Sequence, residues 1–487
     1  RRTVGCHDGP SCEETVIVSM DNIQRDGCFY SLDMSVNSHN IYNITRLLFL
    51  FAAALFVSCS KNDYVNVIPA RCVALASVDM QKVEQAHFDG KAVLKTVLGD
   101  AAEGETGIDH ESRIYLFEAK DGTTGLVARL KSSSDFEKLI ELSVAQKKCD
   151  AVAKRGEVKF SFFNNTWLVA YDDNAMMVTG PITAADRAET ERRVVNYFKQ
   201  DEEQSVVTSK LYSHLDSIDS PIALVAQADA LPDKLVAPFT LGAPKEADAS
   251  QVMVAAGLSF SGDVLKINGT TYSENKTVDE ALKASHAKLR PISADVLKSV
   301  DTAQTMSLVL DVDGRDLLPM LQQNKGVQAM LTGLNMAIDM DNIVRSMDGG
   351  LVIGVSGYGQ DKMNLSMTAK LGNSDWLKDV GYWKKSCPSG CRIDDAGTNA
   401  YCYKGGNTNF YFGVTPSSYF FCGANLQEAM DGTQRSRNPL PTAMEQEMAG
   451  KRMAMLLNIG AVAGTADAAS VVKSVLGNLK YVLYVME

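Results

Sequence analysis

The chain has 487 residues, a length that usually corresponds to two or three domains. Apolar residues make up 45% of it and charged residues 22%, which is typical of globular rather than disordered proteins. Its formal net charge is −11, and lysine and arginine form no run or stripe. Phosphate backbones are bound by clustered cations, so the sequence argues against a nucleic-acid partner.

The first predicted element is a run of eleven apolar residues, 47–57, which follows Arg46 and precedes Ser58 and Cys59. A helix that spans a bilayer needs about 20 apolar residues, so this run is too short to remain in a membrane. A positive residue, a short apolar core and a small residue at the cleavage point are typical of a secretory signal. A cysteine directly after that point predicts a lipoprotein signal, with Cys59 as the lipidated residue. The alternative is a buried core helix, for which residues 1–40 offer no apolar-periodic partner.

This signal sets the predicted N-terminal boundaries. Residues 1–33 are interpreted as over-extended or untranslated sequence, with Met34 (alternatively Met20) as the true start, and residues 34–58 as the signal peptide. Residues 59–66 then form a short tether between lipid and fold. Each buried CH₂ contributes about 0.8 kcal/mol and two or more acyl chains give stable attachment. We therefore expect an outer-membrane lipoprotein of the cell envelope, facing either the periplasm or the cell surface.

After the tether, four blocks of sequence recur in the same order and at nearly constant spacing. The matched blocks are residues 72–79 with 306–313, 126–136 with 367–376, 160–180 with 400–423, and 221–226 with 452–457. In the second pair a strand leads to Ser134 or Ser374, each well placed to N-cap the next helix. The order predicts an internal duplication, and the alternative is a chance likeness among apolar strands.

Glycine-containing links between the apolar strands indicate hairpins at residues 120–122, 261–263 and 357–361. Tight hairpins imply antiparallel pairing. We therefore predict the α+β class, with two duplicated halves, each a mainly antiparallel sheet with helices packed on one face. The predicted boundaries are 67–240 for the first half, 241–300 for a linker with a hairpin and a helix, and 301–487 for the second half. The second half reads as ending one hairpin arm early.

Three short motifs together resemble a known family. The apolar run before Cys59, the entry segment Tyr64–Pro69 and the strand ending in Ser77–Asp79 are similar to Bacteroidetes lipoproteins of the domain-of-unknown-function 4836 family. The resemblance covers roughly residues 59–487, and it implies a lipid-anchored envelope protein. The family has no assigned activity, so the resemblance transfers no catalytic residue and no cofactor.

Four cysteines near the C-terminus form the sharpest candidate cluster: Cys387, Cys391, Cys402 and Cys422. Three interpretations stay open. Outside the cytoplasm disulfides form, and a Cys387–Cys391 bridge would close a small loop. In that case Cys402 and Cys422 pack as small apolar residues in their aromatic strands. Alternatively, all four thiols stay reduced. Four thiolates would also suit a tetrahedral Zn²⁺ ion.

Other residues predict no chemistry. His87, His110, His214 and His286 follow no metal-binding or catalytic spacing, so we expect them at the solvated surface. The aromatic residues 409–412 and 419–421 would suit a platform for stacking sugars or peptides, but a packed antiparallel core explains them more simply.

The sequence favours a non-catalytic binding or assembly module that is attached to the membrane through a lipid anchor at Cys59. The expected partner is an envelope protein or a glycan, and no cofactor is expected. Two alternatives remain open. One is an enzyme whose site is assembled from distant carboxylates. The other is a metal-binding module built on Cys387, Cys391, Cys402 and Cys422.

Overall fold

The structure is a computed structural model that describes residues 62–85, 105–109, 111–231, 233–324, 335, 337–357, 364–405, 408–462 and 479–487. The chain divides into two compact units, residues 1–42 and 43–487, and all described residues belong to the second unit. Cys59 and the predicted signal peptide lie outside the described residues, as do His87 and His110. Within the described residues, each helix is too short or too polar to traverse a bilayer.

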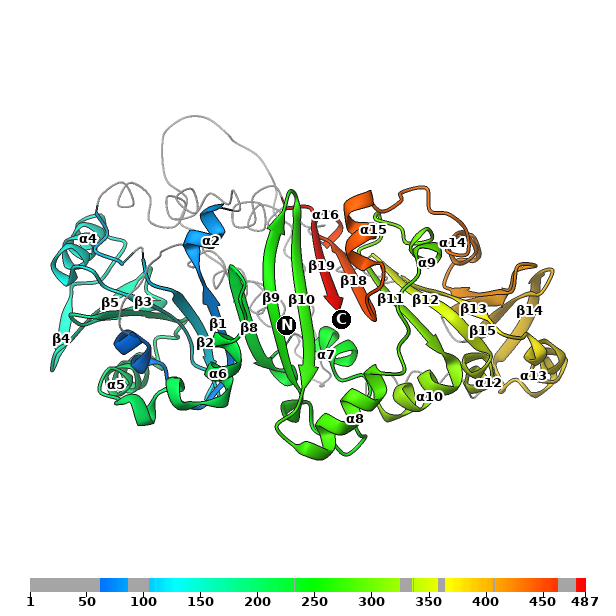
Figure 1. The fold of residues 1–487 in the computed structure, drawn as a ribbon, viewed down its shortest axis with the longest axis horizontal. Helices are drawn as coiled ribbons and strands as arrows, with labels where there is room; N and C mark the ends of the chain where they lie inside the picture. The colour runs from blue at the N-terminus through cyan, green and yellow to red at the C-terminus, as the bar shows by residue number, and fades with distance from the viewer. Residues whose placement is uncertain are drawn as a thin grey trace, which may run out of the picture. The chain divides into compact units, whose positions relative to one another are not determined.

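The described chain has nineteen strands, which all belong to one sheet (Figure 1). Most of them are rich in apolar, β-branched and aromatic residues, and the edge strands β4 and β14 are more polar. The strands before residue 300 are β1 (Cys72–Val78), β2 (Ile114–Ala119), β3 (Thr124–Arg129), β4 (Ala153–Arg155), β5 (Val158–Phe163), β6 (Trp167–Tyr171), β7 (Ala175–Thr179), β8 (Ile222–Gln227), β9 (Met253–Ser261) and β10 (Val264–Tyr272). Those after it are β11 (Met306–Asp313), β12 (Met347–Ser356), β13 (Asn364–Leu371), β14 (Cys391–Gly397), β15 (Ala400–Gly405), β16 (Thr408–Val414), β17 (Tyr419–Gly423), β18 (Met453–Asn458) and β19 (Tyr481–Met486).

The pairing of these strands follows one linear order, β4-β5-β6-β7-β3-β2-β1-β8-β9-β10-β19-β18-β11-β12-β13-β17-β16-β15-β14. All neighbours are antiparallel except β10 and β19, which run parallel. Read outward from β10, the series β9-β8-β1-β2-β3-β7-β6-β5-β4 corresponds strand for strand to β19-β18-β11-β12-β13-β17-β16-β15-β14. The prediction of an α+β fold with mainly antiparallel pairing is confirmed.

The ladder registers of the two series also agree at the blocks that match in sequence. The corresponding cross-strand pairs are Val78–Ile222 with Leu310–Met453, and Leu126–Val178 with Met367–Cys422. In this comparison residue 126 is equivalent to residue 367, and residue 222 is equivalent to residue 453. Both equivalences are the ones that the sequence blocks predicted.

The match between the first strands is displaced by two residues. The registers set Asp79 at the position of Asp311, whereas the sequence pattern had matched it to Asp313. β11 is correspondingly longer, and Asp313 is the residue that caps the following helix, accepting a hydrogen bond from the backbone N–H of Arg315 at 2.8 Å. Side chains alternate between faces with a period of two, so a two-residue shift leaves the apolar pattern unchanged.

Helices cover both faces of the sheet, which corrects the prediction of one covered face. We call the face with Val254, Ala256 and Leu258 of β9 face A, and the opposite face, with Met253 and Ala255, face B. Face A is covered by α2 (Met80–Gln85), α4 (Ser133–Ala145), α7 (Asp233–Phe239), α8 (Lys276–His286), α10 (Gly314–Gln323), α12 (Met340–Arg345), η7 (Asp375–Asp379) and α13 (Val380–Ser386). Face B is covered by η1 (Asn62–Val67), η4 (Val206–Thr208), α5 (Arg187–Tyr197), α6 (Lys210–Asp216), α9 (Ala294–Leu297), α14 (Leu426–Asp431) and α15 (Thr442–Met448). The remaining short helices are η3 (Glu202–Gln204), η5 (Ala228–Ala230), η6 (Ala249–Gln251) and α16 (Ile459–Val462).

Both faces need cover because both are apolar. Consecutive residues of β11, Val309 and Leu310, point to opposite faces and are buried in two different core clusters. A strand buried on both sides reads as a continuous apolar run instead of an alternating pattern, and the centre of β11, Leu308–Leu310, is such a run.

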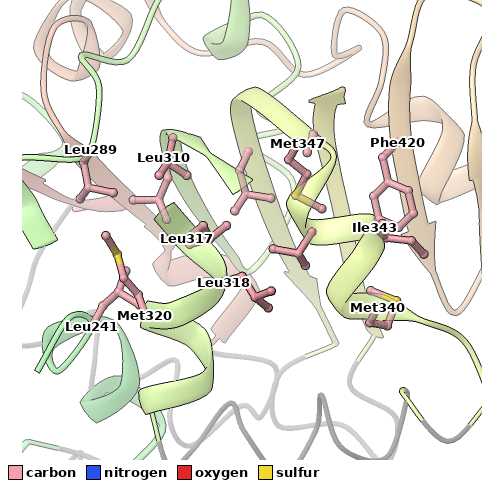
Figure 2. Packing of buried hydrophobic residues seen from close by; sticks show 14 of the residues in the cluster. Leu241, Leu289, Leu310, Leu317, Leu318, Met320, Met340, Ile343, Met347 and Phe420 are labelled. Atoms are coloured by element: carbon pink, nitrogen blue, oxygen red, sulfur yellow. The ribbon is translucent and has the colours of Figure 1, made fainter. Parts of the chain in front are cut away.

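The largest core cluster lies on face A under α10 and α12 (Figure 2). Leu317 and Leu318 of α10 and Ile343 of α12 pack toward the sheet, where each buried side chain of this size contributes about 1.5–3 kcal/mol. Leu241 and Leu289, which belong to the predicted linker 241–300, pack in the same cluster. That segment also carries β9, β10 and α8, and its hairpin lies at the centre of the strand order.

Two of the predicted hairpin turns form as expected. Gly122, between β2 and β3, has φ +83°, and Gly262, in the two-residue link between β9 and β10, has φ +60°. Such left-handed backbone favours glycine. Most of the third predicted turn, residues 357–361, lies outside the described residues.

The predicted helix caps are wrong in detail. Ser132, not Ser134, caps α4, since its hydroxyl accepts a hydrogen bond from the backbone N–H of Asp135 at 3.2 Å. Ser374 precedes the 3-10 helix η7 and makes no side-chain cap bond. The cap positions depend on where each strand ends, which the sequence pattern locates to within one or two residues.

Candidate functional site

The fold separates two of the four C-terminal cysteines. Cys402 pairs across its ladder with Tyr411, and Cys422 pairs with Phe412. Tyr411 and Phe412 are consecutive residues of β16, so the two cysteines point to opposite faces of the sheet. The structure therefore does not bring the four thiols together. No group of three or more His, Cys, Asp or Glu side chains among the described residues is arranged to hold a metal ion.

Cys387 and Cys391 do lie together, in the turn between α13 and β14. The backbone N–H of Cys391 donates to the carbonyl of Pro388 at 3.0 Å, and Gly390 has φ +83°, which closes a tight turn. The hydroxyl of Tyr403 donates to Sγ of Cys391 at 3.2 Å. Both cysteines are free thiols in the structure, and the disulfide between them stays a prediction.

The electrostatics of this turn are consistent with two neighbouring thiols. Partial burial, and next the adjacent Cys391, raise the pKa of the Cys387 thiol. The hydrogen bond to Cys391, burial and the charges of both cysteines raise the pKa of Tyr403 to about 12. The phenol therefore stays protonated at neutral pH and remains a hydrogen-bond donor to sulfur.

The aromatic strands are mostly core. Phe412, Phe420 and Phe421 are buried. Trp376 and Trp383 stack with ring centroids 5.9 Å apart, and Phe412 lies 6.4 Å from each of them. Aromatic pairs at these distances contribute about 0.5–1.5 kcal/mol beyond their area burial. The simpler interpretation of the aromatic run, a packed antiparallel core, is confirmed for these residues.

Half-buried aromatic pairs lie at corresponding places in the two strand series. Tyr403 pairs with Phe410 across β15 and β16, and Phe163 pairs with Trp167 across β5 and β6. A cysteine lies next to each pair, Cys391 beside Tyr403 and a second cysteine, in bridge pairing, opposite Phe163. The cysteines are placed differently, however, because the ladder partner of Tyr403 is Ile393 and Cys391 pairs with Gly405.

Exposed apolar side chains also recur. Of the described residues, two large hydrophobic side chains are exposed, Leu142 at 48% and Tyr382 at 70%. Leu142 lies on α4, which follows β3, and Tyr382 lies on α13, which follows β13. Each lies eight residues after the serine of its Ser-Asp-aromatic motif, Ser134 or Ser374. The two exposed side chains therefore lie at the same sequence distance from the two Ser-Asp-aromatic motifs.

The described carboxylates mostly pair with cations. Arg290 binds Asp311 at 2.7 Å and Asp348 at 2.8 Å. Partial desolvation, and next the charge of Asp248, raise the pKa of Asp229. Both side chains are nevertheless largely exposed to solvent.

The described histidines differ in their surroundings. His214 is half-buried, with its ring centroid 4.4 Å from that of Tyr272 and its Nε2 3.4 Å from the carboxylate of Glu274. The prediction of a solvated surface position is wrong for His286, which is half-buried with Nε2 3.4 Å from Oγ1 of Thr271. Burial, and next the charge of Arg452, lower the pKa of His286. His286 is the last residue of α8, and its contact with Thr271 of β10 could not be predicted from the spacing of the apolar residues in that helix.

Comparison with known proteins assigns the family. The family model described as "Domain of unknown function (DUF4836)" matches residues 84–434, which is more than half of the chain. The chain belongs to this family. The DUF4836 description names no activity, and no curated protein matches the chain.

Solved structures add little to the DUF4836 assignment. Crystal form IV of a protein named TP0453 aligns at 10% identity and a TM-score of 0.27, covering 44% of this chain and 78% of that chain. Crystal form I of TP0453 aligns at 8% identity and a TM-score of 0.21, covering 77% of this chain and 97% of that chain. Both TM-scores are below 0.5, so the likeness supports no conclusion about this chain.

Proposed function

We propose that this DUF4836 chain is a lipid-anchored protein of the outer membrane, and that its two duplicated halves form a non-catalytic binding or assembly module for an envelope protein or glycan. The observation that carries the proposal is the matched exposure of Leu142 and Tyr382 on corresponding helices. The sequence ending at Ser58 and Cys59 supports the anchor.

Duplication is supported at three levels. The strand order repeats on the two sides of β10, and α4 and α13 follow corresponding strands and cover the same face. Helices α6 and α15 precede β8 and β18 and both cover face B. Even surface ion pairs recur, since Lys138–Asp135 and Lys378–Asp375 each span 2.7 Å at matched positions. Agreement in order, register and surface pairs together supports duplication over chance likeness.

The matched apolar positions favour binding. An isolated exposed hydrophobic residue needs no explanation, but two at the same position of repeated helices indicate a shared use. Tyrosine is enriched at protein interfaces because its rigid ring supplies contact area and its hydroxyl supplies a hydrogen bond. A partner that contacts both halves gains avidity without any additional type of contact.

The binding test compares matched variants. Tagged protein is incubated with detergent extracts of the envelope or with isolated envelope glycans, and the retained components are quantified by mass spectrometry. Leu142→Ser and Tyr382→Ser should each reduce retention, and the double variant should reduce it most. Lys138→Ser changes an exposed residue of α4, and Lys378→Ser changes an exposed residue of η7, which directly precedes α13; both variants should retain the wild-type amounts. Equal retention by all five variants would contradict the proposed surface.

A separate experiment tests the anchor. Wild-type protein from cells should partition with detergent and carry an acylated Cys59 as its first residue, and Cys59→Ser should remain uncleaved and unlipidated. An unmodified Cys59 within an uncleaved, water-soluble chain would refute the location. Protease treatment of intact cells then distinguishes the two faces of the outer membrane, because only a surface-exposed chain is degraded.

A further inference from the structure

We infer that Cys387 and Cys391 form a redox-active dithiol, which a disulfide-bearing oxidant converts into an intramolecular disulfide joining the end of α13 to the start of β14. The inference is independent of the proposed binding function. It rests on the geometry of the turn, on the space around the two sulfur atoms and on the hydroxyl of Tyr403.

The turn holds the two cysteines close before any bond forms. Cys387 is the residue that ends α13, and Cys391 is the first residue of β14. The backbone bond from Cys391 to Pro388 at 3.0 Å and the left-handed conformation of Gly390 keep the connection short. The tight turn therefore keeps the two cysteines close together in the chain's path.

The strand opposite leaves room for the sulfur. Cys391 pairs across the ladder with Gly405, and a Cβ atom added to Gly405 would lie 2.9 Å from Sγ of Cys391. Any larger residue would compete with the thiol for that space. Cys387 and Cys391 are half-buried, whereas Cys402 and Cys422 are buried. Small reagents therefore reach the first two in preference to the others.

Tyr403 gives the two thiols different roles. Its hydroxyl donates a hydrogen bond to Sγ of Cys391 and holds that sulfur in place. Burial opposes ionisation of Cys387. We therefore assign Cys391 as the attacking sulfur and Cys387 as the resolving thiol.

The reaction is thiol–disulfide exchange with a small disulfide, RSSR. Sγ of Cys391 attacks one sulfur of RSSR, the S–S bond breaks, and one RS⁻ leaves with the electron pair and takes up the proton that Cys391 lost. Sγ of Cys387 then attacks Sγ of Cys391, expelling the second RS⁻, which takes up the proton of Cys387. The protein is oxidised by two electrons, and RSSR is reduced to two RSH.

The test uses the full chain and oxidised glutathione. After incubation at several glutathione redox ratios, peptide mapping should show one bond between Cys387 and Cys391 and a loss of about 2 Da. Cys387→Ser should accumulate a glutathione adduct on Cys391, Cys391→Ser should react slowly, and Tyr403→Phe should slow formation of the bond several-fold. Cys402→Ser is the matched control and should oxidise like the wild type.

A second measurement avoids variants altogether. Brief alkylation of the folded wild-type chain should label Cys387 and Cys391 before oxidation and neither of them after it. The inference is overturned if both thiols remain open to alkylation after oxidation, if both carry glutathione, or if either bonds to a different cysteine. Equal adduct formation at Cys387 and Cys391 in the single variants would overturn the assigned roles.

Discussion

Gly314 and Gly381 provide a test in which helix propensity and tertiary packing predict opposite outcomes. Gly314 is the first residue of α10 and follows the capping residue Asp313. A Cβ atom added there would lie 1.7 Å from the carbonyl oxygen of Val344. Gly381 lies within α13, and a Cβ atom added to it would meet nothing within 4 Å.

The expected magnitudes follow from these distances. Replacing glycine by alanine in a helix gains about 1 kcal/mol through backbone entropy. At Gly314 the obstacle is the backbone of α12, which cannot rotate away as a side chain would. Overpacking then costs about 3 kcal/mol, the upper end of the usual range, so Gly314→Ala should lower the free energy of unfolding by about 2 kcal/mol. Gly381→Ala should instead raise it by about 0.5–1 kcal/mol.

Urea unfolding of the wild type and both variants, followed by circular dichroism and tryptophan fluorescence, measures the difference. The fluorescence of Trp376 and Trp383 reports on this half of the sheet, since both indoles pack in the same core cluster as α10. If Gly314→Ala is as stable as the wild type or more so, the close approach of α10 to α12 is incorrect. A loss of stability in Gly381→Ala would show that the space next to Gly381 is not open as the structure has it.

Other substitutions test individual hydrogen bonds and one titration. Tyr484→Phe should be neutral or stabilise the fold by about 1 kcal/mol, because this buried hydroxyl has no hydrogen-bond partner among the described residues. Tyr64→Phe should cost about 1 kcal/mol, because it removes a 2.6 Å hydrogen bond to a backbone carbonyl. Thermal unfolding distinguishes the two variants, and equal effects would contradict these hydrogen-bond assignments. Ser132→Ala should cost about 1 kcal/mol in urea unfolding and Ser134→Ala less than about 0.5 kcal/mol, and the reverse order would restore the cap predicted from sequence. The hydrogen bonds of Asp313 to the side chain and backbone of Arg315 lower its pKa to about 2, so its contribution is complete above about pH 5 and is lost as the pH falls toward 2. The stability difference between wild type and Asp313→Asn should shrink over that range, and a pH-independent difference would contradict the ion-pairing account.

Local features of the sequence determined much of the fold. The α+β class, the turns at Gly122 and Gly262 and the order of the repeated blocks follow from apolar periodicity and from glycine conformation, which act over a few residues. The sequence also predicted that Phe412 and Phe420 belong to a packed core, because aromatic residues on neighbouring strands bury one another. The matched blocks also aligned residue 126 with residue 367 and residue 222 with residue 453, as the ladder registers do.

The tertiary structure alone decided which groups meet. Alternation with a period of two does not distinguish Asp311 from Asp313, and it does not show that Cys402 and Cys422 point to opposite faces, because strand pairing sets both. Which helices cover which face, and hence that Leu142 and Tyr382 remain exposed, depends on contacts between residues far apart in the chain. Such contacts are chosen by the packing of the whole sheet, and no short window of sequence contains that information.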